Sequence, residues 1–190
     1  MLDKTIPHII FPMKREAGTP IPQRPLPPGY SFRMFQQGYE KEWARIEASV
    51  GEFDCELDAL LYFQREFMAY PDEITRRCIF VEAPDGEIIG TASAWWCYIG
   101  KRRRPRVHWV AIKPEHQGMG LGKPLVTEVL RLMLETDGDD VFYLSTQTWS
   151  YKAVGLYKWA GFYITDEKDM MGCTNDRYDE AVALIDAIST

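Results

Sequence analysis

Three glycines at alternating positions, Gly118, Gly120 and Gly122, stand between an apolar segment and an amphipathic one. Residues 107–112 have the pattern of a short strand, and apolar residues at helical spacing follow over 121–134. Glycine lets the backbone turn and approach a ligand where a Cβ would collide. A helix that begins after such a loop directs its free N–H groups and the positive end of its dipole at one point. The stretch therefore predicts an anion site, most naturally for a phosphate; a β–α turn without a ligand is the alternative.

The spacing excludes two common phosphate-binding loops. A Walker loop requires Gly, four residues and then Gly-Lys-Ser/Thr, but Gln117 occupies the first of these positions and Pro124 the last. A dinucleotide loop requires G-x-G-x-x-G, whereas the glycines here alternate. The remaining pattern, Gln-x-x-Gly-x-Gly from Gln117 to Gly122, resembles the acyl-CoA pyrophosphate loop of the GCN5-related N-acetyltransferases (GNAT family).

A second motif, in residues 150–162, strengthens this resemblance. The family's corresponding helix reads Asn-x-x-Ala-x-x-Leu-Tyr and is followed shortly by Gly-Phe. The matching positions are Ala153, Leu156, Tyr157, Gly161 and Phe162. Ser150 stands where asparagine is usual, which weakens the expected side-chain contact with CoA. Together the two motifs span about residues 107–162.

Composition favours an ordinary globular protein and excludes several classes of site. The chain has 190 residues, 46% hydrophobic and 26% charged, and a formal net charge of -6, which argues against broad nucleic-acid binding. The four cysteines are far apart, which argues against a disulfide framework, and the three histidines lack the spacing of a metal site. No signal peptide or membrane-spanning apolar run is evident. We therefore expect a cytoplasmic protein without metal, nucleic-acid or membrane partners.

Patterning predicts a proline-rich N-terminal arm over residues 1–29 and a single acetyltransferase domain over residues 30–190. Prolines between positions 12 and 28 make the arm extended rather than helical. Strands are predicted near 30–35, 77–82, 87–98, 107–112, 141–146 and 162–165, and helices at 39–50, 56–68, after the glycine loop, at 151–160 and at 177–188. The basic run 101–106 is expected to form a hairpin. The tail has a helical pattern, whereas the family commonly ends in strands.

The expected fold class is α/β (α+β). The helix between the strands at 107–112 and 141–146 implies that these strands pair in parallel. By resemblance, the sheet is that of the acyl-CoA N-acyltransferase fold: mixed and mostly antiparallel, with a central parallel pair that splays apart, flanked by helices.

The resemblance implies acetyl-CoA as co-substrate, without a metal. The residues expected to bind it are Val110, Ala111, Ile112, Gln117, Gly118, Met119, Gly120, Leu121, Gly122, Lys123, Ser150 and Ala153, with Lys113 beside the pyrophosphate.

Acetyl transfer to an amine requires a group that removes the amine proton, donors for the developing oxyanion and an acid for the leaving sulfur. By resemblance, the amide near Val110 points at the thioester oxygen and Tyr157 is the acid; helix packing is the alternative for Tyr157. His108 is the histidine on the active strand, and some relatives use such a residue to move the amine proton. A water chain as the base, with His108 as a core residue, is equally compatible.

We therefore expect an N-acetyltransferase that acts on a primary amine of a small molecule, amino-acid-like or polyamine-like, by direct attack in a ternary complex. A polypeptide acceptor and a non-catalytic acyl-CoA-binding module are the alternatives. Arginines 102–104 hint at an acidic group on the acceptor. Candidates for the acceptor pocket are Phe53, Tyr62, Phe67 and Tyr70, each of which is also compatible with helix core. The oligomeric state stays open, with a homodimer among the options.

Overall fold

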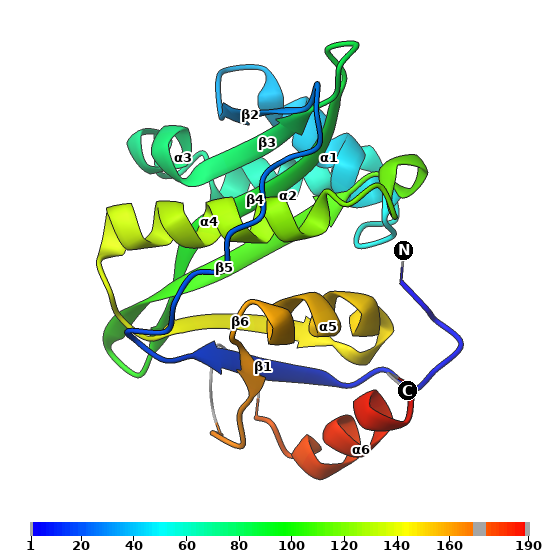
Figure 1. Cartoon of the computed structure of the whole chain (residues 1–190), viewed down its shortest axis with the longest axis vertical. Coiled ribbons are helices and arrows are strands. Elements are labelled where there is room, and N and C mark those ends of the chain that lie inside the picture. The colour runs from blue at the N-terminus through cyan, green and yellow to red at the C-terminus, as the bar shows by residue number, and fades with distance from the viewer. Residues whose placement is uncertain (1, 169–173, 189–190) are drawn as a thin grey trace.

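The computed structural model describes residues 2–168 and 174–188, whose seven strands form one sheet with helices on both faces (Figure 1). In chain order the elements are β1 (Ile10–Arg15), β2 (Ser31–Met34), α1 (Tyr39–Ser49), α2 (Glu56–Glu66), α3 (Pro71–Arg77), β3 (Cys78–Glu82), β4 (Ile88–Ile99), β5 (Arg102–Ile112), the 3-10 turn η1 (Pro114–His116), α4 (Gly122–Asp137), β6 (Phe142–Gln147), the 3-10 turn η2 (Thr148–Ser150), α5 (Tyr151–Trp159), β7 (Tyr163–Ile164) and α6 (Tyr178–Ile188). The strand order is β2-β3-β4-β5-β6-β1-β7. Only β5 and β6 pair in parallel among the described strands, which confirms the predicted mixed sheet.

Alternation along the strands divides the core between the two faces of the sheet. In β3, Ile79 and Val81 pack with the residues of α4 and α5, whereas Cys78 and Phe80 pack with those of α1 and α2. Successive side chains of a strand point to opposite faces, so each strand contributes to both layers. The glycine loop therefore lies on the α4 side, and the aromatic residues of α1 and α2 lie on the other.

The proline-rich lead differs from the expected arm, because Ile10–Arg15 forms an internal strand between β6 and β7. Phe11 and Met13 are fully buried. Pro12 is tolerated because its carbonyl accepts a hydrogen bond from the amide of Thr165 on the β7 side. A residue in an antiparallel ladder directs its N–H and C=O at the same neighbour, so the amide that proline lacks would face the short β7 and not β6.

Residues 16–30 then cross the face of α4 to reach β2 at the opposite end of the sheet (Figure 1). The hydroxyl of Thr127 in α4 donates to the carbonyl oxygen of Pro22 at 2.9 Å. Arg131, also in α4, donates to the side chain of Gln23. The proline-rich residues 16–30 thus form an extended segment, the strap, which lies over the helix that follows the glycine loop.

The predicted hairpin at the basic run is confirmed: Arg102 pairs with Ile99 in the β4–β5 ladder, so Gly100 and Lys101 form the turn and the arginines that follow belong to β5. The short helix α3 was not predicted from the sequence; it begins at Pro71, whose missing N–H costs nothing in a first turn. The predicted closing helix is confirmed as α6.

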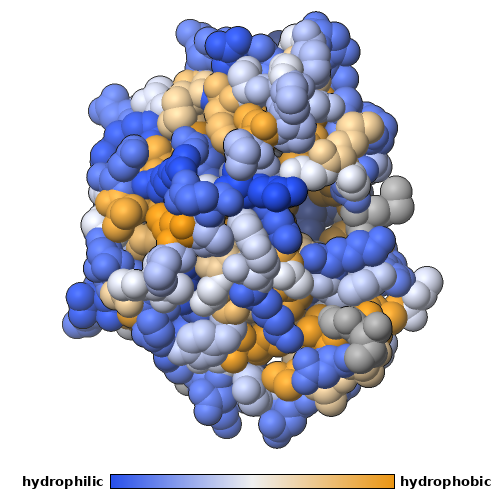
Figure 2. Space-filling view, viewed as in Figure 1, coloured by the Kyte–Doolittle hydropathy of each residue, from blue (hydrophilic) through white to orange (hydrophobic). Residues whose placement is uncertain are grey.

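The surface carries no continuous apolar face in the view of Figure 2, where hydrophobic side chains form separate patches among hydrophilic ones. Within the described residues, every helix is too short or too polar to cross a membrane.

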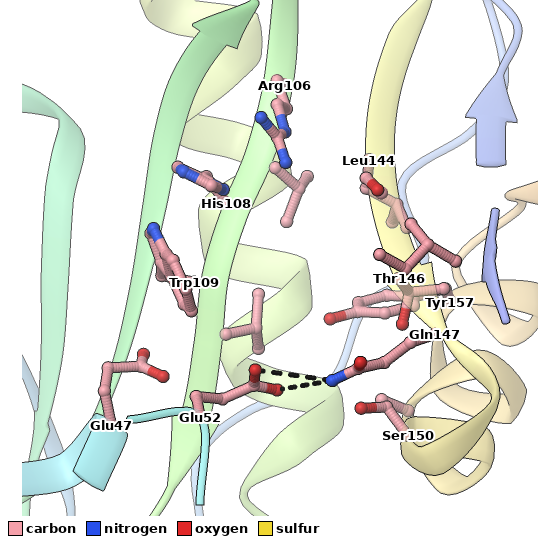
Figure 3. A pocket seen from close by; sticks show the side chains of 15 residues that line it. Glu47, Glu52, Arg106, His108, Trp109, Leu144, Thr146, Gln147, Ser150 and Tyr157 are labelled. Atoms are coloured by element: carbon pink, nitrogen blue, oxygen red, sulfur yellow. Dashed lines mark hydrogen bonds between the residues drawn. The ribbon is translucent and has the colours of Figure 1, made fainter. Parts of the chain in front are cut away.

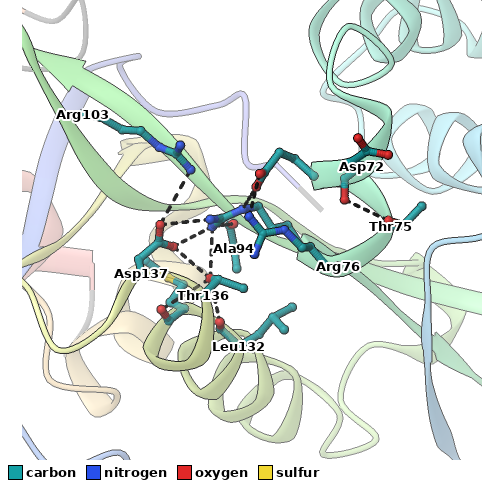
Figure 4. Close-up of polar contacts among 11 residues, drawn as sticks. Asp72, Thr75, Arg76, Ala94, Arg103, Leu132, Thr136 and Asp137 are labelled. Carbon is teal, nitrogen blue, oxygen red and sulfur yellow. Dashed lines mark hydrogen bonds and ion pairs between the residues drawn. The ribbon is translucent and has the colours of Figure 1, made fainter.

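A buried arginine joins α3, β4 and the end of α4. Arg77 is 1% exposed; its guanidinium donates to the carbonyl of Ala94 at 3.0 Å, to Thr136 at 3.0 Å and to Asp137 at 2.6 and 3.1 Å. Thr136 and Asp137 lie at the C-terminal end of α4, beside Ala94 of β4 (Figure 4). Arg77 also pairs with Glu73. The contact fixes the far end of the helix whose first turn carries the glycine loop.

We expect Arg77→Met to lower the free energy of unfolding by about 3–5 kcal/mol, because it leaves a carboxylate and a carbonyl without their buried partner. Arg76→Met is the matched control: Arg76 pairs with the same Glu73 at 2.6 Å but is 52% exposed, so its loss should cost less than about 1 kcal/mol. Denaturant titrations of both variants measure the difference. Equal losses would contradict the structural role of the buried arginine.

Candidate active site

The sheet opens between the parallel strands β5 and β6. Arg106 pairs with Tyr143 where the two strands are in register. Further along β5, the ladder with β4 shifts register near Trp109, whose φ is 50°. Such a bulge bends its strand and increases the local twist. The next residue, Val110, borders the opening that results.

The inner cavity, as we term it, occupies this opening and has a volume of about 280 Å³. Its walls come from α1 and the loop after it, from β5 and β6, from α5 and from the start of β1 (Figure 3). The lining residues are Ile10, Glu47, Glu52, Arg106, Val107, His108, Trp109, Val110, Leu144, Ser145, Thr146, Gln147, Ser150, Ala153 and Tyr157.

A second space, the loop cavity, has a volume of about 580 Å³ and adjoins the glycine loop. It is lined by Leu2, Arg24, Val50, Glu52, Val110, Ala111, Ile112, His116, Gln117, Gly118, Gly120, Leu121, Gly122, Lys123, Ser150, Lys152, Ala153 and Leu156. Four residues line both cavities: Glu52, Val110, Ser150 and Ala153. The two cavities are therefore adjacent compartments that meet at the splay of β5 and β6.

The loop itself requires glycine at specific positions. Gly118 and Gly120 have φ values of 82° and 80°, in the region that other residues rarely adopt. Gly122 begins α4, and a Cβ there would lie 3.2 Å from Leu156 of α5. The same cavity is lined by the start of α4, by Lys152 and by Lys123, whose ammonium lies 4.9 Å from the centre of the Trp159 ring. This arrangement can bind an anionic group such as a phosphate.

Nearly all residues predicted to bind the cofactor line this loop cavity. Met119 does not: its side chain is 50% exposed and lies within 3.6 Å of the Tyr30 hydroxyl. Lys113 also lies elsewhere, because its ammonium pairs with Glu87 at 2.5 Å. The Met119 side chain is thus directed toward solvent and the buried Lys113 side chain toward Glu87, while their neighbours Ile112, Gly118 and Gly120 line the cavity.

Tyr157 lies on α5 and directs its ring into the inner cavity (Figure 3). The side chain is 7% exposed. Burial, and then the nearby carboxyls of Glu47 and Glu52, raises the pKa of Tyr157 above its usual value. The phenol therefore stays protonated at neutral pH, as a proton donor must.

Two carboxyl groups face the inner cavity from the α1 side. Burial, followed by the charge of Glu52, raises the pKa of Glu47 well above its usual range. Its Oε1 is buried without a hydrogen-bond partner among the described residues. Burial also raises the pKa of Glu52, while the amide of Gln147, which donates at 3.3 Å, opposes that rise. A buried carboxyl with a raised pKa is a stronger base than an exposed one.

His108 also borders the inner cavity, at 3.5 Å from the hydroxyl of Tyr62. Burial, and then the charge of Arg106, lowers the pKa of His108 well below its usual range. The ring is therefore neutral at physiological pH. It can accept a proton, but it is a weaker base than an exposed histidine.

Three charged groups line this cavity that were not predicted from the sequence: Glu47, Glu52 and Arg106. For Glu47 a signal was present: it follows Trp43 by four residues and Ile46 by one, so it lies on the apolar face of α1, where a charge is unusual. Glu52 follows the helix in a loop with no pattern. Arg106 belongs to a basic run of the kind that is usually exposed to solvent, so its sequence position does not predict a place in a cavity.

The aromatic candidates for the acceptor pocket are not among the residues that line either cavity. Phe67 is fully buried in the core of α1 and α2, where Phe53 and Tyr62 pack beside it, and the exposed Tyr70 makes an edge-to-face contact with Trp96. Tyr62 does not line the cavity itself but contacts its wall: its hydroxyl accepts a hydrogen bond from the indole N–H of Trp109 at 3.3 Å. The aromatic core thus supports the bulge and does not form the cavity wall.

No cluster of His, Cys, Asp and Glu side chains suited to a metal ion occurs in the described part of the chain. The site instead combines an anion-binding loop, a protonated phenol, buried carboxyls and a neutral imidazole around one junction. These groups can bind a phosphorylated thioester on one side and move protons on the other.

Comparison with known proteins agrees with this arrangement. The model of the Acetyltransferase (GNAT) family matches residues 34–162. Mycothiol acetyltransferase of Streptomyces coelicolor is 30% identical over 155 residues, which is 81% of this chain and 49% of that protein. Mycothiol acetyltransferase of Salinispora tropica is 25% identical over 85% of this chain and 53% of that protein. The chain thus spans about half the length of the curated relatives it matches.

Solved structures share the fold at low sequence identity. A GCN5-related N-acetyltransferase from Sphaerobacter thermophilus superposes with a TM-score of 0.63 at 21% identity, over 82% of this chain and 48% of that one. Spermidine N-acetyltransferase from Vibrio cholerae, in complex with CoA and spermine, superposes with a TM-score of 0.51 at 19% identity, over 72% of this chain and 88% of that one. Because the family model covers both motifs and the strands β3 to β6, the chain belongs to the acetyltransferase (GNAT) family.

Proposed function

We propose that the chain is an N-acetyltransferase that moves an acetyl group from acetyl-CoA to the primary amine of a small molecule, by direct attack in a ternary complex. The observation that carries this proposal is the junction of the two cavities at Val110, Ser150 and Ala153. A thioester held in the loop cavity and an amine held in the inner cavity would meet there. Direct attack needs both reactants bound together in contact.

The loop cavity would bind the CoA portion. The backbone from Gln117 to Gly122 would hold the pyrophosphate at the first turn of α4, with Lys123 and Lys152 nearby. Arg24, from the strap over α4, lines the same cavity. The backbone at Val110 would direct its amide at the thioester oxygen, where negative charge develops during attack.

The acceptor amine arrives protonated and must lose a proton before it attacks. We assign this role to Glu47, because burial raises the pKa of its carboxyl and so makes the carboxylate a stronger base than an exposed one, whereas burial lowers the pKa of His108. His108 is the alternative base. Tyr157 would donate its proton to the sulfur as CoA leaves, which its raised pKa allows at neutral pH.

The volume of the inner cavity, about 280 Å³, favours a small acceptor over a folded polypeptide. Relatives named for mycothiol and for spermidine acetylation support a small-molecule amine as the acceptor class. A peptide acceptor or a non-catalytic acyl-CoA-binding role are the rival functions. Binding of acetyl-CoA without turnover of any amine would favour the non-catalytic role.

Calorimetric titration with acetyl-CoA, with NADH and ATP as controls, tests the cofactor assignment. We expect one-site binding of acetyl-CoA alone. Gly120→Ala should weaken it about tenfold, because a Cβ at positive φ costs about 1–2 kcal/mol. Gly155→Ala, in α5 with no atom within 4 Å of the added Cβ, should bind as the unsubstituted protein does. No binding by the unsubstituted protein would refute the acetyl-CoA assignment.

We expect Tyr157→Phe to bind acetyl-CoA normally and to lose turnover by about 10²-fold or more, the usual size of a general acid's contribution. The substitution removes one hydroxyl and keeps the packing against Phe162. Release of CoA measured with a thiol reagent gives kcat, and calorimetry gives the affinity. Unchanged kcat would remove the acid assignment.

The pH dependence of kcat/KM for the amine should distinguish the two candidate bases. Since Glu47 acts as a carboxylate, the rate should fall as pH falls through its pKa, which burial raises above the usual carboxyl range. Glu47→Gln should abolish this acidic limb and lower kcat, whereas His108→Gln should leave the limb in place. Loss of the limb in His108→Gln alone would assign the proton to His108 instead.

A further inference from the structure

In the basic run of residues 101–106, Arg103 and Arg104 have acidic partners, whereas Arg106 lies in a cavity without one. Arg104 pairs with Asp140 at 3.1 Å, and Arg103 stacks over Trp96 at 4.1 Å and lies 3.7 Å from Asp137. Arg106 instead lines the inner cavity. Within the described residues it forms no ion pair, and its buried Nε has no hydrogen-bond partner.

No negative charge in the described structure compensates this guanidinium. Burial is the main influence on Arg106 and lowers its pKa; only Cys97 and Tyr62 oppose that effect. Burial raises the pKa of Cys97 to about 11 and raises that of Tyr62, so both groups are uncharged at neutral pH. Arg106 is partly buried, and a desolvated charge without a partner is costly. Such a cost is typical of a ligand-binding site.

The position of Arg106 indicates which ligand would pair with it. Arg106 does not line the loop cavity, so the phosphates of CoA do not reach it. Within the inner cavity it lies at the opposite end from Glu47 and Glu52 (Figure 3). Glu52 lies at the junction with the loop cavity, which is where an amine must be to attack the thioester.

The cavity is therefore polarised, with carboxyls at the reacting end and a cation at the far end. Along β5, Arg106 and Val110 are four residues apart, or at most about 13 Å between Cα atoms at the rise of a strand. The long arginine side chain shortens the span that a ligand must cover. An acceptor that satisfies both ends carries its amine and an anion several bonds apart.

We propose that Arg106 determines acceptor specificity by binding an anionic group, so that the acceptor is a small molecule with a primary amine at one end and a carboxylate or phosphate at the other. This inference rests on the proposed acetyltransferase function and narrows its acceptor class. Arginine suits either anion, because its planar guanidinium can donate two parallel hydrogen bonds.

Matched amines test the proposal: 4-aminobutanoate against butylamine, 6-aminohexanoate against hexylamine, and 3-aminopropyl phosphate against propylamine. With the full chain and saturating acetyl-CoA, we expect KM for each anionic amine to be at least about tenfold lower than for its neutral partner, since a charge-assisted pair contributes about 1.5–3 kcal/mol. The pair with the larger ratio distinguishes a carboxylate from a phosphate acceptor.

The variants separate recognition from structure. Arg106→Met should bring the ratio of KM values close to one, and Arg106→Lys should restore part of it. Arg103→Met, an exposed arginine of the same strand, should keep the ratio of the unsubstituted protein. Thermal melts confirm that each variant is folded. An equal loss of kcat/KM for both members of each pair in Arg106→Met would overturn the proposal in favour of a structural role.

A binding measurement keeps the inference separate from the proposed function. Calorimetric titration of each amine into the CoA-bound protein requires no turnover. Tighter binding of the anionic amines, lost in Arg106→Met, supports the inference even if no amine is acetylated, in which case the proposed catalysis fails alone. Equal binding of anionic and neutral amines, or no binding of either, overturns the role of Arg106, and turnover of neutral amines would then leave the acetyltransferase function standing.

Discussion

The separation of β5 from β6 is the constraint on which the rest of the structure depends. Two parallel strands that pair at Arg106 and Tyr143 would ordinarily continue side by side, and the bulge at Trp109 prevents this. The opening exposes backbone groups in the middle of the sheet, where hydrogen-bonding groups would otherwise be satisfied by a neighbouring strand. Both cavities begin at this opening, one toward the glycine loop and one toward α1.

The surrounding elements hold the opening in place. On one face, Tyr62 accepts the indole N–H of Trp109, and the aromatic core of α1 and α2 packs behind the bulge. On the other face, α4 is held at its C-terminal end by Arg77 and crossed by the strap of residues 16–30. A glycine loop can offer a defined anion site only if the helix that follows it is fixed. The contacts distant from the cavity therefore contribute to the geometry of the site.

Burial also sets the chemistry of the inner cavity. The same desolvation raises the pKa of Glu47 and Tyr157 and lowers that of His108 and Arg106, because it always disfavours the charged form. The consequences differ by residue type. The phenol of Tyr157 stays protonated, the carboxylate of Glu47 becomes a stronger base and the imidazole of His108 a weaker one. The guanidinium of Arg106 has no anionic partner among the described residues.

The sequence by itself determined the features that depend on local pattern. The glycine loop, the helix motif around Tyr157, the parallel pairing of β5 and β6 and the closing helix α6 all follow from residue spacing within short segments. Only the tertiary structure decided that Ile10–Arg15 joins the sheet. Ile9, Phe11 and Met13 alternate as buried residues of a strand do, but the nearby prolines argue against a strand, and a proline fits a sheet only where the neighbouring strand does not need its missing N–H. It also decided which charges face the cavity. Glu47, Glu52 and Arg106 come from segments far apart in the chain, and their burial arises only when those segments pack around one opening.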